Sequence, residues 1–468
     1  MQRITSRKKL LFYAFGGMGV NLLGIIVSSY LVSGLIAGGF EESALANHTY
    51  LGIDLIIPSI WAIFAVVVKI IDGVIDIPMA SLTDNLRTRW GRRRPALLIG
   101  VIPMILSYLA FLWIPFPNVA ITSDPSTWDA GAWGNTIFYF VILAIFYTSY
   151  TLTMVTYYAT FTEIVDNEND RRFLTNTKSF ADVVYFTLGF ALVPVILKGL
   201  NIRLVGLIVL PLVFLILIPF FMIKEESTKD GVLNEKGEKK TVNLFKSIGY
   251  TFKNWKFVLW MICYSFMIFG LQLFLNGINE YFSVAGMSMI FVMMAAFAPV
   301  PFTFIVYNKL NKKKGFGFAY QYTLIIFALA MLSMFGISFL EAGTLKLILS
   351  IVSGLFASFS IGAMFAVSYS IPSKLAADDE KETGISHAAM YFAVQGLFAG
   401  VASGIGGGAV LTILKDNPLF ARPGTFYITL IAAIAGLIAF CLVFILPKSL
   451  RQLGKEENNI TRTETEQK

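Results

Sequence analysis

The feature that most constrains this chain is the recurrence of apolar windows that are each long enough to cross a lipid bilayer. A helix of about 20 apolar residues spans the hydrocarbon core. Such windows lie near residues 11–37, 52–80, 95–116, 135–158, 181–198, 203–223, 256–282, 285–307, 317–339, 345–372, 388–414 and 424–446. The composition agrees, because 56% of the residues are hydrophobic and only 14% are charged. The sequence therefore predicts an all-α membrane protein with twelve transmembrane helices.

The basic residues predict the orientation of these helices. With the N-terminus placed inside, 31 of the 37 Lys and Arg residues fall on the cytoplasmic side. The predicted outer loops 38–51 and 117–134 contain neither, whereas the run 87–94 contains five Arg. This asymmetry is the positive-inside pattern, so the net charge of +8 needs no nucleic-acid partner. We expect a multi-pass protein of the cell (inner) membrane with both termini cytoplasmic and no cleaved signal peptide.

The chain divides into two halves at a polar stretch. Residues 224–256 are rich in Lys, Glu and Gly, and they separate a six-helix bundle at 1–223 from a second one at 257–447. The remaining tail, 448–468, is polar. Basic loops follow the second and the eighth span and share a Leu and a Gly, as expected of transporters built from related halves.

The sequence offers no sign of an enzyme or of a metal site. Cys263 and Cys441 lie inside apolar spans, and His48 and His387 lie in predicted loops without ligand-like neighbours. Twelve spans also leave little room for a soluble catalytic domain. We therefore expect no enzymatic activity, no cofactor and no bound metal.

Three ionisable residues lie within the second apolar window. Lys69, Asp72 and Asp76 are spaced i, i+3 and i+7, so they share one helix face. Each ionisable side chain at bilayer depth costs about 2.5–3.5 kcal/mol, which makes such residues functional candidates. Two carboxylates four residues apart can coordinate a cation, or share a proton because their repulsion favours the protonated form of one of them. The alternative is a structural Lys–Asp bridge with a spare carboxylate.

The motif around these residues resembles a known family. Residues 69–78 read Lys-x-x-Asp-Gly-x-x-Asp-x-Pro, and residues 87–95 read Arg-x-Arg-Trp-Gly-Arg-Arg-Arg-Pro. This pattern is similar to the glycoside-pentoside-hexuronide:cation symporters, which include the melibiose permeases and belong to the major facilitator superfamily. The resemblance implies the major facilitator fold, in which two six-helix bundles enclose a central cavity.

The resemblance also implies site residues. The helix-II carboxylates of the family bind the coupling cation, which assigns that role to Asp72 and Asp76, with Lys69 as their charge partner. Lys178 stands in place of a sugar-contacting arginine, and Gln395 is retained. Other positions depart from the family. An aspartate becomes Asn21, another becomes Val155, a lysine becomes Gly400, and a tryptophan falls near Phe365.

Carbohydrate sites combine aromatic faces with a few directed polar groups. On this ground the fourth span contributes Tyr147, Tyr150 and Thr151 as candidate substrate residues, and the seventh contributes Asn276. An aromatic helix face can equally be plain packing, and a polar one can serve interhelical hydrogen bonding.

The Arg-rich loop after the second span is a candidate latch for a cytoplasmic gate. It can equally bind anionic lipid head groups or act as a simple positive-inside anchor. The residues that we expect in the latch are Asp84, Arg87, Arg89, Glu163, Asp170 and Arg171.

These observations predict a secondary transporter, a monomer in the lipid bilayer that carries out cation-coupled symport of a sugar or glycoside by alternating access. A symporter of an amphipathic or lipid-like solute, a membrane sensor without transport, and a membrane enzyme are the alternatives. The coupling ion can be H⁺ or Na⁺. We favour H⁺, because family oxygen ligands fall on Ile75 and Leu152, and Thr151 and Thr153 would replace them only if the fourth helix were rotated.

Overall fold

The structure is a computed structural model that describes residues 3–32, 55–113, 116, 124–165, 168–197, 200, 202–229, 252–383, 388–453 and 455. Within these ranges, eleven helical segments are long and apolar enough to cross a membrane. The remaining predicted span is the fifth, whose apolar helical stretch, Phe180–Phe190, is shorter. It is shorter because the preceding residues of the same helix are largely polar. The all-helical prediction is confirmed.

The N-terminal bundle contains the first six spans. Its elements are α1 (Arg7–Phe15), α2 (Met18–Ile25), η1 (Ile26–Leu31), α4 (Pro58–Asn85), α5 (Arg93–Phe111), η3 (Pro125–Thr127), α6 (Ala130–Glu163), α7 (Glu168–Thr187), η4 (Leu188–Leu192), α8 (Val193–Ile196), α9 (Ile202–Val209), η5 (Leu210–Ile216) and α10 (Leu217–Met222). Helices α4 and α5 pack on α6, while α1 and α2 pack on α7. Helix α2 also contacts α6, so the fourth and fifth spans both lie close to the first.

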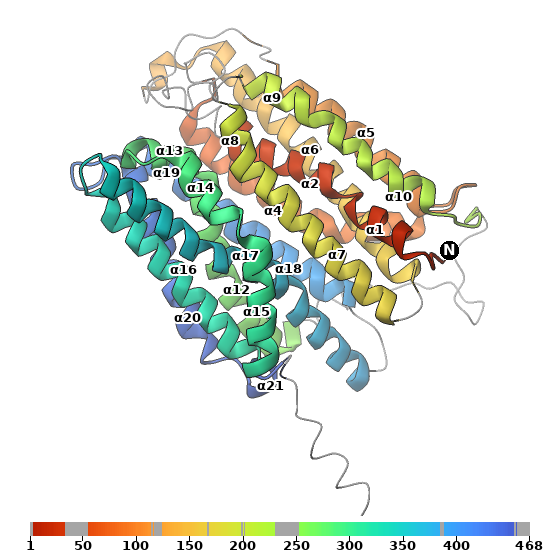
Figure 1. The fold of residues 1–468 in the computed structure, drawn as a ribbon. Helices are drawn as coiled ribbons and strands as arrows, with labels where there is room; N and C mark the ends of the chain where they lie inside the picture. Colours follow the sequence, from red (N-terminus) through yellow and green to blue (C-terminus); the bar gives the residue numbers. More distant parts are fainter. Residues whose placement is uncertain are drawn as a thin grey trace, which may run out of the picture.

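The C-terminal bundle contains the other six spans. Its elements are α12 (Trp255–Asn276), α13 (Ile278–Ala285), α14 (Met289–Phe297), α15 (Val300–Lys314), α16 (Phe316–Ser338), α17 (Thr344–Thr383), α18 (Ala388–Ser403), η6 (Gly404–Val410), α19 (Leu411–Asp416), η7 (Gly424–Tyr427), α20 (Ile428–Val443) and α21 (Lys448–Arg451). Helix α16 packs on α17 and α20, and α12 packs on α18 and α20. Figure 1 shows this bundle, green to blue, beside the N-terminal one, red to yellow-green.

Two helix pairs form most of the contact between the bundles. Helix α4 lies along α18 and η6, and the α7–η4 segment lies against α14, α15 and α17. The first contact depends on glycine. A Cβ atom on Gly73 would lie 2.6 Å from the Cα of Leu397, so any other residue at this position would clash with the backbone of α18.

Within the part of the chain that the structure describes, three spans contain a π-helical segment: η1 in the first, η4 in the fifth and η6 in the eleventh. All three follow an α-helical stretch that begins at the end predicted to be cytoplasmic. π-Helical turns are rare and are frequently found at functional sites. The two bundles thus place irregular turns at comparable depths of their fifth helices, η4 and η6.

Large apolar side chains remain exposed on the outside of both bundles. Leu106 on α5 is 61% exposed and Phe302 on α15 is 72% exposed. Such surfaces are expected where lipid, and not water, surrounds the helices. They agree with the prediction of a polytopic membrane protein.

The orientation of the bundles can be tested by labelling cysteines from outside. Cys263 is buried and Cys441 is exposed, so both are first replaced by Ala. We expect Lys236→Cys, in the predicted cytoplasmic linker, to resist a membrane-impermeant maleimide in intact cells, because the basic loops stay inside. Ser126→Cys, within η3 in a predicted outer loop, is the positive control. Labelling at position 236 before cell lysis would contradict the topology.

Candidate solute and cation site

Four polar side chains meet between α2, α6 and α7. On α7, Lys178 Nζ and Asp182 Oδ1 form an ion pair one turn apart, and each side chain is only 7% exposed. Asn21 Nδ2 donates to Asp182 Oδ1 at 3.5 Å, and Tyr150 OH donates to Asn21 Oδ1 at 2.8 Å. Lys178 Nζ also lies 5.2 Å from the centroid of the Tyr158 ring. We refer to Asn21, Tyr150, Lys178 and Asp182 as the polar cluster.

The sequence predicted three members of the polar cluster but missed the fourth. Asn21, Tyr150 and Lys178 were expected to contact substrate, and the structure brings them into one network. Asp182 was not singled out, although it lies in the predicted fifth span and follows Lys178 by four residues. Lys178 precedes the predicted fifth span at 181–198, yet it is buried in the bundle beside its counter-ion.

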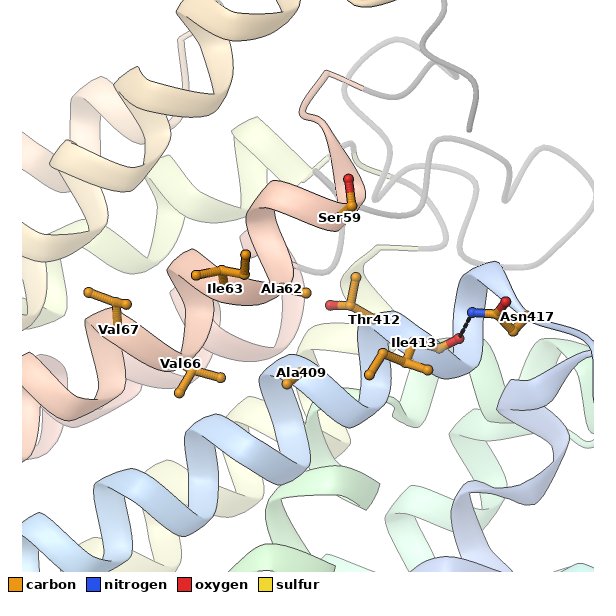
Figure 2. Close-up of a pocket in the computed structure, with 9 residues that line it drawn as sticks. All are labelled: Ser59, Ala62, Ile63, Val66, Val67, Ala409, Thr412, Ile413 and Asn417. Atoms are coloured by element: carbon orange, nitrogen blue, oxygen red, sulfur yellow. Dashed lines mark hydrogen bonds between the residues drawn. The ribbon is translucent and has the colours of Figure 1, made fainter. Parts of the chain in front are cut away.

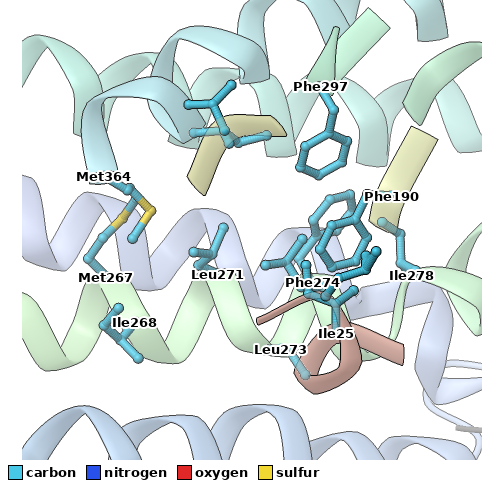
Figure 3. Packing of buried hydrophobic residues seen from close by; sticks show 14 of the residues in the cluster. Ile25, Phe190, Met267, Ile268, Leu271, Leu273, Phe274, Ile278, Phe297 and Met364 are labelled. Atoms are coloured by element: carbon cyan, nitrogen blue, oxygen red, sulfur yellow. The ribbon is translucent and has the colours of Figure 1, made fainter. Parts of the chain in front are cut away.

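An apolar contact between the bundles lies next to the polar cluster, on the side of the predicted outer surface. Asp182, Phe186 and Phe190 follow one another at i+4 spacing, so they share a stripe of the fifth span. The Phe186 and Phe190 rings lie 5.4 and 4.9 Å from the ring of Phe297, on α14 of the other bundle. Figure 3 shows Phe190 and Phe297 stacked close to Ile25.

Hydrogen bonds reinforce this contact. Asn279 Nδ2, on α13, donates to the carbonyl oxygen of Ser29, on η1, at 3.1 Å. Thr187 Oγ1 donates to the carbonyl oxygen of Phe297 at 3.2 Å. The first and fifth spans are therefore joined to the C-terminal bundle beyond the polar cluster, and we refer to these contacts as the outer closure.

Tyrosine side chains bound the polar cluster toward the predicted cytoplasmic end. Tyr157 OH donates to the carbonyl oxygen of Tyr13 at 2.6 Å, and the two rings stack with centroids 5.7 Å apart. Tyr13 OH and Thr160 Oγ1 are also hydrogen-bonded. The polar cluster thus lies between an aromatic layer and the outer closure.

The other candidate substrate residues lie elsewhere on α6 and in the C-terminal bundle. Tyr147 and Thr151 are buried on α6. In the C-terminal bundle, Gln395 Oε1 accepts from Trp260 Nε1 at 2.9 Å, and its Nε2 donates to the Ser368 carbonyl oxygen at 2.7 Å. Gln395 thereby ties α18 to α12 and α17.

Two further candidates also belong to the C-terminal bundle. Asn276 ends α12, and its Oδ1 is a buried acceptor with no hydrogen-bond donor in the part of the chain that the structure describes. The side chain of Phe365 lies outside the described residues. The roles of both residues in substrate binding remain predictions.

The candidate cation residues lie on α4, which is one continuous helix over Pro58–Asn85. The side chains of Lys69 and Asp72 are outside the described residues. Asp76 Oδ2 lies 2.6 Å from the position that a Cβ atom on Gly396 would take. The Asp76 carboxylate therefore points to α18, across the interface between the bundles, where a cation would sense their relative position.

Residues that follow α10 form hydrogen bonds with the Arg-rich loop at residues 87–94. Glu225 Oε2 accepts from the backbone N–H of Arg93 at 2.7 Å, and the N–H of Thr228 donates to the Thr88 carbonyl oxygen at 3.1 Å. The sequence did not identify Glu225 or Thr228, because the contact joins distant loops. Gly91 has φ +82°, a conformation that favours glycine, so the loop can turn tightly against Glu225.

The predicted latch residues are only partly described. Arg87 and Arg89 are exposed. Asp170 Oδ1 lies 3.7 Å from Arg7 Nε, at the start of α1. The side chains of Asp84, Glu163 and Arg171 lie outside the described residues, so the latch remains a prediction.

A pocket of about 570 Å³ lies between α4 and the η6–α19 segment. Figure 2 shows its lining, which is Ser59, Ala62, Ile63, Val66, Val67, Ala409, Thr412, Ile413 and Asn417. It contains no charged side chain, and the Asn417 amide donates to the Ile413 carbonyl oxygen of its own helix at 2.9 Å. Ile63 and Ile413 are largely exposed. This pocket is therefore an apolar recess on the outside of the protein and lacks the polar groups of the cluster.

Among the described residues, two helical bundles with eleven membrane-length helices and a shorter fifth span, and an ion pair buried among α2, α6 and α7, define a transporter of the major facilitator type. Residues 12–446 match the family described as MFS/sugar transport protein. The chain therefore belongs to this family, whose members are transporters and not enzymes.

Related proteins agree with this assignment. An uncharacterized symporter of Synechocystis sp. is 35% identical over 130 residues, which cover 28% of this chain and 22% of that protein. The lactose permease of Lactobacillus helveticus is 26% identical over 183 residues, or 38% of this chain and 26% of the permease. The matched region thus spans about a quarter of the length of either relative.

Solved structures share the fold. The D-xylose-proton symporter superposes with a TM-score of 0.60 at 16% identity, covering 96% of this chain and 99% of the symporter. The nucleoside transporter NupG superposes with a TM-score of 0.55 at 13% identity, covering 95% and 100%. At these identities the likeness shows the major facilitator fold alone.

The glycine contact between α4 and α18 generates a prediction. Gly73→Ala should force the helices apart and destabilise the protein by about 1–3 kcal/mol, as overpacking does. Gly336→Ala on α16 is the matched control, because no atom lies within 4 Å of the added Cβ. Thermal unfolding of the two variants in detergent measures the difference. Equal unfolding temperatures would contradict the close packing.

Proposed function

We propose that this protein is a cation-coupled symporter that moves a sugar or glycoside by alternating access. The polar cluster is the observation that carries the proposal. Lys178 and Tyr150 supply donors, Asp182 supplies acceptors, and Asn21 supplies both. Hydroxyl groups of a carbohydrate can pair with each of these side chains, and the Tyr158 ring beside Lys178 offers an aromatic face to the C–H surface of a sugar.

The family and its relatives support a carbohydrate solute. The family description names sugar transport, one relative is a lactose permease, and one solved structure is a xylose-proton symporter. Another solved structure is a nucleoside transporter. Each of these named solutes contains a sugar ring.

The outer closure supports alternating access. Its hydrogen bonds and stacked rings join the first and fifth spans to the opposite bundle, so they would have to separate for solute to enter from outside. Rocking of two bundles around a central site is the usual mechanism of such folds. We place the transporter in the cell membrane as a monomer, with the solute bound between the two bundles.

Asp72 and Asp76 are proposed to bind the coupling ion, with Lys69 as their charge partner. A cation on these carboxylates would stabilise the state that binds solute, and the solute would tighten cation binding by the same factor. Asp76 supports this role because its carboxylate points to α18 of the other bundle.

We favour H⁺ as the coupling ion. A bound Na⁺ needs several oxygen ligands. The hydroxyl groups of Thr151 and Thr153 are the candidates that the sequence offers on the fourth span. Thr153 Oγ1 donates to the Ser149 carbonyl oxygen of its own helix at 2.8 Å and packs on Gly100 of α5. Ile75 and Leu152 are apolar. A proton requires no such ligand shell.

A second candidate is symport of an amphipathic solute. The apolar pocket between α4 and η6 favours it, because an acyl chain could lie there. The charged pair in the polar cluster argues against it, since an acyl chain cannot pair with buried charges.

The proposed coupling predicts a specific defect. Asp72→Asn and Asp76→Asn should each abolish sugar accumulation driven by an imposed pH gradient, yet retain some exchange of labelled sugar, because the solute site remains. Uptake into membrane vesicles, with and without gradients of H⁺ and Na⁺, measures both.

Asp124→Asn, an exposed carboxylate that precedes η3, is the control and should leave accumulation unchanged. If Asp72→Asn and Asp76→Asn both accumulate sugar as well as the wild type does, the assignment of these aspartates to the coupling ion is refuted. Strong stimulation of the wild type by Na⁺ at constant pH would change the ion but keep the two aspartates.

A further inference from the structure

Asp182 gives the polar cluster a property that the proposed function does not itself require. Lys178 carries one positive charge and Asp182 one negative charge, and both are buried. Asn21 and Tyr150 are neutral side chains. The ion pair therefore makes the cluster electrically neutral before any solute arrives.

The partners of Asp182 come from two helices. Its Oδ1 faces Lys178 from α7 and accepts a hydrogen bond from Asn21 of α2, which in turn accepts one from Tyr150 of α6. The carboxylate thus lies where the first, fourth and fifth spans converge. It also shares a stripe with Phe186, which contacts the opposite bundle through Phe297.

A buried neutral pair discriminates between solutes by their charge. An anionic solute would compete with Asp182 for Lys178 and leave a carboxylate without compensation, and a cationic solute would do the converse to Lys178. Leaving one buried charge unpaired is strongly unfavourable. A neutral solute with adjacent hydroxyls can insert between the partners, because a hydroxyl both donates and accepts.

We infer that the Lys178–Asp182 pair is the charge filter of the solute site and selects neutral polyhydroxylated solutes over sugar acids and amino sugars. Asp182 accepts a solute hydroxyl, and Lys178 donates to a neighbouring one. The inference rests on the proposed sugar transport. It adds that Asp182, paired with Lys178, determines which net charge a transported solute can have.

Single neutral variants test the filter. In Asp182→Asn the positive charge of Lys178 is no longer compensated, so the preference should shift from neutral glycosides to hexuronides. In Lys178→Gln the carboxylate remains, so the preference should shift to amino sugars. Loss of one charge-assisted hydrogen bond should weaken binding of the neutral glycoside about tenfold to a hundredfold.

The readout is competition by the three sugar classes against uptake of a labelled neutral glycoside in proteoliposomes, together with sugar-induced thermal shifts of the purified protein. The double variant Lys178→Gln with Asp182→Asn contains no unpaired charge, so it stays informative if a single variant does not fold. It should still disfavour both charged sugar classes, because each would be a buried charge without a partner, and it should bind the neutral glycoside more weakly than the wild type because both charge-assisted hydrogen bonds are lost.

A second, largely buried ion pair provides a matched control. Lys415 Nζ lies 3.1 Å from Glu280 Oε1 in the C-terminal bundle. The double variant Lys415→Gln with Glu280→Gln removes that pair, and its charge preference should remain that of the wild type.

The possible failures are distinguishable. If the wild type transports neutral glycosides but neither Asp182→Asn nor Lys178→Gln shifts its preference toward a charged sugar, or the double variant binds the neutral glycoside as tightly as the wild type, the charge filter is overturned while sugar transport stands. If the wild type responds to no sugar and binds lysophospholipid, the proposed function itself fails, and the filter with it.

Discussion

Lipid offers no hydrogen bonds, so every polar group buried among these helices must find its partner inside the protein. Lys178 meets this requirement through Asp182, and the pair is extended by Asn21 and Tyr150. Removing one partner of a buried ion pair typically costs about 3–5 kcal/mol. The members of this network come from α2, α6 and α7. The network therefore forms only because these three helices meet at one depth.

The two contacts between the bundles are built from different side chains. Helix α4 approaches α18 at Gly73 and Gly396, which lets backbones and a carboxylate come close. The α7–η4 segment meets α14 through phenylalanine rings, one pair tilted and one stacked. Small residues favour close helix packing in membranes, where no hydrophobic force draws the helices together. The glycine contact places Asp76 at the boundary, and the aromatic contact encloses the polar cluster.

Much of the fold could be predicted from the sequence, because the number of membrane-spanning helices follows from the lengths of the apolar windows. No knowledge of tertiary contacts is needed for this step. Asn21 and Lys178 could be selected from a family resemblance, and Tyr150 from the combination of aromatic and polar side chains that carbohydrate sites use. Asp182 was predictable from the rule that ionisable residues at bilayer depth are functional candidates, since it is a carboxylate in an apolar window four residues after Lys178. The contact of Glu225 with the Arg93 backbone was not, because it joins loops far apart in sequence. The π-helical segments depend on hydrogen-bond register, which composition does not encode.

The free energy of the outer closure can be compared with the binding energy that is needed to open it. A neutral hydrogen bond contributes about 0.5–1.5 kcal/mol, and an aromatic pair contributes a similar amount beyond its buried area. The outer closure consists of a few contacts of this size, such as those of Asn279 with Ser29 and of Phe190 with Phe297. Its total free energy is therefore only a few times that of one contact. A ligand must prefer one state by about 5.5 kcal/mol to move a two-state population from 1:99 to 99:1. The closure is of the same order, so a differential binding energy of that size would be enough to reverse the populations of the open and closed states.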